Sequence, residues 1–155
     1  MANDNESTVE FEGINQVFGT DEVPAVTPST LKIYLEYLQK HLSLPCTLTG
    51  IESIGYFGWE ERFEFGHGSK REYEKLRKKR GSLNDSYELS SLDTAWLDRD
   101  SGIVVVVNRI HERKRFELPQ RNRFEIPLAE LEAEDEASHN YQLLDDYSVW
   151  FVNWR

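Results

Sequence analysis

The residues that could do chemistry are carboxylates gathered near the end of the sequence. Residues 124–154 contain eight acidic side chains and no lysine or arginine. Calcium takes about six to eight oxygen ligands, largely from carboxylates and carbonyls. Six of the acids lie close enough in sequence to converge, and we predict them as calcium ligands: Glu132, Glu134, Asp135, Glu136, Asp145 and Asp146. The alternative from composition is an acidic surface that only keeps the protein soluble.

Two other motifs resemble ligand sites less closely. Asp98, Asp100 and Gly102 are spaced roughly as in an EF-hand loop. The closing position carries Arg109 where glutamate is needed, so we predict an ordinary turn there. Residues 66–71 precede a predicted basic helix and could hold a phosphate or sulfate at its N-terminus. Their spacing matches no phosphate-loop motif, which favours a simple turn into the helix.

Catalytic chemistry has little support in the sequence. The four histidines show no close spacing with one another or with Cys46, so neither a zinc site nor a thiol nucleophile is indicated. Cys46 follows a proline in an apolar context, which is typical of a buried, inert thiol. A carboxylate pair such as Asp98 with Asp100 would lack a base, a nucleophile and an oxyanion donor. We predict that the protein is not an enzyme.

The acidic segment needs an ordered element to hold it. Four apolar residues step by four, three and four positions: Leu143, Tyr147, Trp150 and Trp154. This spacing is that of one side of a helix, and it places Asp145 roughly opposite and Asp146 at the flank. Periodicity alone leaves open a final strand over residues 149–152.

Another helix is predicted over residues 28–42. Thr27 can cap it, Pro28 suits its first position, and Pro45 bars its continuation. Its apolar residues recur at helical spacing, so we expect this helix to pack across a sheet.

The middle of the sequence predicts mainly strands. The strand candidates are residues 46–54, 59–65, 87–97, 103–110, 116–118 and 124–128, with a hairpin turn at 98–102. Residues 70–80 predict an exposed basic helix, because a Ser69–Glu72 capping pattern opens it and Gly81 closes it. We therefore predict an α+β fold. An N-terminal helix packs on a small antiparallel, SH3-like β-barrel, followed by an aromatic-rich C-terminal helix or strand.

The domain organisation follows from composition. Residues 1–27 carry six acids and no base, and we predict a flexible acidic arm with at most one short docked strand. Residues 28–155 are long enough for a single domain with its own core.

Net charge restricts the partners. The chain of 155 residues carries a net charge of −10, which argues against non-specific binding to nucleic acid or to an anionic membrane. The longest aliphatic run, residues 103–107, is far shorter than the roughly 20 residues that span a bilayer. No charged start followed by an apolar core marks a secretion signal, so we expect a cytoplasmic protein. The sequence does not predict the oligomeric state.

Two blocks of sequence resemble a known family. Residues 34–47 are YLEYLQKHLSLPCT, and residues 126–150 are IPLAELEAEDEASHNYQLLDDYSVW. With their Leu-Pro helix exit, their Pro-Leu strand end and the acidic stretch that follows, they are similar to the CcbP-like family of bacterial calcium-binding proteins. The sequence departs from that family in a longer segment over residues 55–100, in Cys46 and in the added N-terminal arm.

The resemblance implies a helix leading into a small barrel-like sheet, with calcium ligands from the acidic stretch and the Asp145-Asp146 pair. Our leading prediction is therefore reversible calcium binding, as a buffer or a sensor. The alternative is a metal-free interaction module, such as an inhibitor or immunity protein, whose acidic face docks a basic protein partner.

Overall fold

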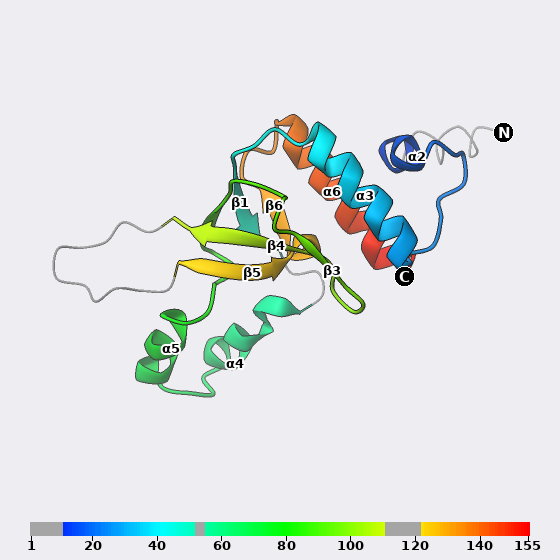
Figure 1. Cartoon of the computed structure of the whole chain (residues 1–155). Helices are drawn as coiled ribbons and strands as arrows, with labels where there is room; N and C mark the ends of the chain where they lie inside the picture. Colours follow the sequence, from blue (N-terminus) through cyan, green and yellow to red (C-terminus); the bar gives the residue numbers. More distant parts are fainter. Residues whose placement is uncertain (1–10, 52–54, 111–121) are drawn as a thin grey trace.

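The computed structural model describes residues 11–51, 55–110 and 122–155, and it has an α+β fold. Two long helices, α3 (Pro28–His41) and α6 (His139–Asn153), lie side by side along one side of an antiparallel sheet (Figure 1). Two short helices, α4 (Glu61–Glu64) and α5 (Lys70–Arg77), form a separate pair away from them. The α+β class predicted from the sequence is confirmed.

The sheet has six strands and is open. The strands are β1 (Cys46–Gly50), β2 (Ser86–Leu89), β3 (Trp96–Asp98), β4 (Gly102–Arg109), β5 (Arg123–Pro127) and β6 (Leu131–Ala133). Their order is β3-β4-β2-β1-β6, and β5 pairs with β4. The sheet is antiparallel as predicted, but it does not form a closed barrel. The 3-10 helix η2 (Leu128–Glu130) separates β5 from β6, and no pairing between those two strands closes the described part of the sheet.

Strand β4 forms the centre of the core. Ile103, Val105 and Val107 are fully buried, as expected for a continuous aliphatic run. The predicted hairpin at 98–102 is confirmed, since Asp98 pairs with Gly102. The Asp98 carboxylate also accepts hydrogen bonds from the backbone N–H groups of Asp100 and Ser101. The predicted strand over 87–97 is interrupted between β2 and β3, where Leu92 is buried.

The two long helices begin at polar caps. The Thr27 hydroxyl accepts a hydrogen bond from the backbone N–H of Thr30, whose own side chain accepts one from the N–H of Thr27. The helix predicted for residues 28–42 is thus confirmed as α3. Ser138 caps α6 in the same way by accepting from the N–H of Tyr141. Residues 139–153 are helical, so the alternative of a final strand is not what the structure shows.

The strand predicted at residues 59–65 is wrong. This segment forms the 3-10 helix η1 (Tyr56–Glu60) and then α4. The expectation rested on Phe63 and Phe65 sharing a face, but Phe65 is 74% exposed. Trp59 and Phe63, four residues apart, are the pair that packs, which is helical spacing.

The described part of the predicted arm contains helix α2 (Glu12–Phe18). Ile14 is buried in the core, and the Phe18 ring lies 5.6 Å from the ring of Tyr34 and 5.3 Å from that of Trp150. We expected at most one short strand here, because the apolar residues looked scattered. Their spacing fits a short helix instead. Residues 1–10 and the predicted strand at 116–118 lie outside the described residues.

Candidate functional site

Three of the six predicted ligands lie near one another. Glu132 is on β6, Glu136 is in the following turn, and Asp145 is on α6. Burial is the main cause of a raised pKa at Glu132, and the negative charges of Glu136 and Asp145 raise it further. The hydroxyl of Tyr141 offsets part of this rise through a hydrogen bond. Glu132, Glu136 and Asp145, which we call the acidic triad, therefore share one electrostatic environment.

The local fold explains how these residues meet. Strand β6 pairs with β1, the turn over residues 134–138 reverses the chain, and α6 packs back against η2 and β6. Glu132 lies between buried Leu131 and Ala133, so its side chain points away from the core. Tyr141 and Asp145 are four residues apart and share one side of α6. The charge of Glu132 is the main cause of a raised pKa at Tyr141, which agrees with their proximity.

The other three predicted ligands face different neighbours. Asp146 is half-buried and accepts a hydrogen bond of 2.9 Å from the side-chain amide of Gln142. It lies against Gly13 of α2, where any Cβ would clash with its carboxylate. The pKa of Asp146 is raised, mainly by burial.

Glu134 and Asp135 make local contacts instead. The Ser86 hydroxyl donates a hydrogen bond to the carboxylate of Glu134, which joins this residue to β2. The carboxylate of Asp135 accepts from the N–H of Ala137, and its carbonyl accepts from the Ser138 hydroxyl at 2.6 Å. Asp135 therefore shapes the turn that leads into α6.

The metal-binding geometry of the acidic triad is not preassembled. Within residues 11–51, 55–110 and 122–155, no group of three or more His, Cys, Asp or Glu side chains is placed to hold a metal ion. Calcium needs about six to eight oxygens at short range, so the triad would have to draw together and recruit carbonyls or water. Glu136 and Asp145 are exposed, so their side chains can turn without disturbing the core. The donor chemistry fits calcium, whereas the arrangement requires side-chain movement.

Cys46 lies apart from this site and is half-buried. Burial raises the pKa of its thiol to about 11, so it stays protonated at neutral pH. The sequence predicted a buried, inert thiol; the raised pKa is in line with low reactivity, whereas the side chain is only half-buried.

A partly buried polar cluster beside α4 and α5 was missed by the sequence analysis. Asp85 binds Arg77 through two contacts of 2.8 Å and lies 3.5 Å from buried Arg109. Burial alone would raise the pKa of Asp85, but the hydrogen bonds from Arg77 and from the backbone of Ser82, together with both positive charges, lower it. Because these partners are 8 and 24 residues away along the chain, no local sequence pattern joins them. This cluster fastens the segment between β1 and β2 to the sheet.

The comparisons with known proteins add no assignment. No family model, no curated protein and no solved structure matches the chain. Among the described helices, none is both long and apolar enough to cross a membrane.

Proposed function

We propose that this protein binds calcium reversibly and that the acidic triad supplies the carboxylates. The supporting observation is that the charges of Glu136 and Asp145 both raise the pKa of Glu132. Carboxylates that repel one another are stabilised by a cation placed between them. A divalent ion with oxygen preference is the simplest such partner.

The position of the triad would couple binding to local order. The turn over residues 134–138 separates Glu132 from α6, and Glu136 belongs to that turn. An ion bridging the triad would draw the turn against α6. Another molecule would then recognise the ordered turn. Such a calcium-dependent change of shape distinguishes a calcium sensor from a buffer.

The experiment is isothermal titration of chelator-treated protein with calcium, repeated in millimolar magnesium. Magnesium demands a smaller octahedral site and loses water reluctantly, so it competes poorly at a site shaped for calcium. The proposal predicts a saturable heat that persists in magnesium. A weak heat that magnesium abolishes would contradict it, because that result is expected of bulk negative charge.

A second candidate function is docking of a basic protein partner on the same acidic face. The observation that favours it is that no preassembled metal group occurs among the described residues. Acidic faces steer basic partners and bind them most tightly at low salt. A pull-down from the native host at low salt should then return a basic protein that is lost at higher salt. Failure to recover such a protein would exclude this candidate.

We also propose that the open sheet is related to the SH3-like arrangement. The support is that β1 pairs with both β2 and β6, and that η2 precedes the returning strand β6.

A further inference from the structure

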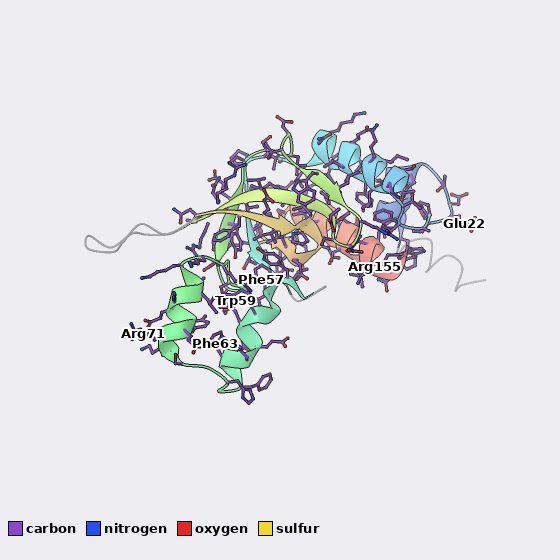
Figure 2. The ribbon with its side chains drawn as sticks, turned by 60° about the horizontal axis from the view of Figure 1, so that its bottom comes forward. Glu22, Phe57, Trp59, Phe63, Arg71 and Arg155 are labelled. Carbon is purple, nitrogen blue, oxygen red and sulfur yellow. The ribbon has the colours of Figure 1, made fainter. Side chains whose placement is uncertain are left out.

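A cavity lies in the segment between β1 and β2, apart from the acidic triad. It has a volume of about 350 Å³ and is bounded by α4, α5 and the loop at Asn84. Figure 2 shows Trp59 and Phe63 between these two helices, with Arg71 on the outer side of α5. The volume falls within the range of about 300–1,000 Å³ that is usual for small-molecule sites.

One wall of this cavity is aromatic and held in place. The rings of Phe63 and Tyr73 meet edge to face, with centroids 5.3 Å apart. Trp59 stacks behind Tyr73 at 5.8 Å and donates a hydrogen bond to the carbonyl of Gly81. Gly68 has φ of +146°, and a Cβ there would come within 2.6 Å of the Phe63 ring. The glycine therefore lets this ring lie close to the chain that borders the cavity.

The cavity is also lined by acidic side chains. Glu60 and Glu64 both line it. Glu60 is only 8% exposed and accepts hydrogen bonds of 2.9 Å from the Tyr73 hydroxyl, the Ser82 hydroxyl and the N–H of Leu83. These donors are neutral, and the ion pairs found among the described residues include neither Glu60 nor Glu64. Arg77 interacts with Glu60 electrostatically, since the pKa of Arg77 is raised mainly by its hydrogen bonds to Asp85 and also by the charge of Glu60. Among the described residues that line the cavity, Lys70 is the one base, and it is exposed.

The charges disfavour an anion in this cavity. The first turn of α5 lies at its edge, where the sequence analysis considered phosphate or sulfate but favoured a simple turn into the helix. The Ser69 hydroxyl already accepts from the N–H of Glu72, and the Glu72 carboxylate lies in the first turn of the helix, where it compensates the positive end. Two carboxylates on the cavity wall add repulsion toward any anion.

We propose that this cavity binds the alkylammonium group of a small organic cation. Aromatic rings attract cations through the negative faces of their π systems, and quaternary ammonium groups are bound by aromatic cages. A nearby carboxylate adds direct Coulomb attraction for an ammonium group. The Phe63 ring already contacts one cation outside the cavity, since the Arg62 guanidinium lies 4.5 Å from its ring centroid and Arg62 does not line the cavity. Glu60 and Glu64 supply the negative charge, and Phe63 with Tyr73 supplies the apolar contact.

The test is a titration of the full chain with an ammonium salt at constant ionic strength, monitored by two-dimensional ¹H–¹⁵N NMR. One arm uses n-butylammonium chloride, and the other uses tetramethylammonium chloride. Saturable chemical-shift changes confined to residues 60–73 and 84 support the proposal. The salt with the higher affinity shows whether the cavity prefers a primary or a quaternary ammonium group. Shifts that fail to saturate, or that match those caused by sodium chloride, would overturn it. So would shifts centred on Glu132 and Asp145.

Three variants sharpen the result. Glu64→Gln should weaken binding by about threefold or more, whereas Glu61→Gln removes the same charge from α4 outside the cavity and should have little effect. Lys70→Gln removes a positive side chain from the described part of the wall and should strengthen binding. A gain cannot arise from damage to the fold, so it is an independent check. Equal effects of Glu64→Gln and Glu61→Gln, or weaker binding in Lys70→Gln, would refute the assignment.

Discussion

Replacing Tyr147 by phenylalanine tests how α6 is fixed to the sheet. The Tyr147 side chain is fully buried, and its hydroxyl accepts a hydrogen bond of 2.9 Å from the backbone N–H of Ile103 on β4. Tyr147→Phe would leave this N–H without its partner in the core. An unsatisfied buried donor costs about 1–3 kcal/mol, so we expect the free energy of unfolding to fall by that amount.

Tyr34 offers a matched control in the same core. Its ring lies 5.1 Å from the ring of Tyr147, and it is equally buried. Within the described part of the chain, however, its hydroxyl has no hydrogen-bond partner. Tyr34→Phe removes a buried polar atom that makes no such bond, and we expect a change within about 0.5 kcal/mol or a small gain in stability.

The assay is urea unfolding of both variants, with the slope of the transition checked against that of the parent protein. With a slope of about 2 kcal/mol/M, the midpoint of Tyr147→Phe should lie about 0.5–1.5 M lower. The midpoint of Tyr34→Phe should stay close to that of the parent. Equal losses in the two variants would refute the reasoning, because the hydrogen bond to Ile103 would then not be the distinguishing contact.

Two further predictions concern the acidic triad and the β3–β4 turn. Because the pKa of Glu132 is raised on folding, its charge opposes folding above that pKa, and the penalty disappears as the pH falls below the ordinary value. Glu132→Gln should therefore raise the urea midpoint at pH 7 and leave it nearly unchanged below about pH 4, and a lower midpoint at pH 7 would contradict this. Gly102→Ala should destabilise by about 2 kcal/mol or more, since Gly102 has φ of +75° and a Cβ would come within 2.6 Å of Phe151 and Tyr147. Gly19→Ala, with φ of +65° and nothing within 4 Å of the Cβ, should cost only about 1 kcal/mol, and thermal unfolding of both variants compares them.

Local patterns were sufficient where neighbours in sequence also determine the structure. The capping residues at Thr27 and Pro28 predicted the start of α3, and the turn residues from Asp98 to Gly102 predicted the hairpin. The apolar run in β4 predicted a buried strand. In each case the residues that determine the local structure lie within a few positions of one another, so they can be recognised in a single sequence.

Patterns were misleading where two periodicities competed. Phe63 and Phe65 suggested a strand, while the packing of Trp59 and Phe63 on Tyr73 from α5 favours a helix. Helix α2 was missed because it is only seven residues long and gains its stability from contacts with Tyr34 and Trp150. A short helix of this kind is defined by tertiary packing more than by its own sequence.

The site was predictable only in part for the same reason. Closeness in sequence suggested that β6, its following turn and α6 would bring the six acids together, and in the structure Glu132, Glu136 and Asp145 share one electrostatic environment. Helical spacing placed Asp145 opposite the apolar side of the helix and Asp146 at its flank, but it did not show what lies against Asp146. Asp145 is exposed near Glu132, whereas Asp146 is half-buried against α2. The position of α2 decides that difference, and the sequence analysis had treated α2 as part of an arm.

The most direct measurement of the central claim is the calcium affinity of Asp145→Asn compared with that of Asp146→Asn. Both substitutions remove one negative charge from the same helix, so bulk electrostatics changes equally. If the acidic triad holds calcium, Asp145→Asn should weaken binding at least about tenfold, while Asp146→Asn should leave it within about twofold of the parent protein. Equal affinities in the two variants, or a larger loss in Asp146→Asn, would contradict the assignment.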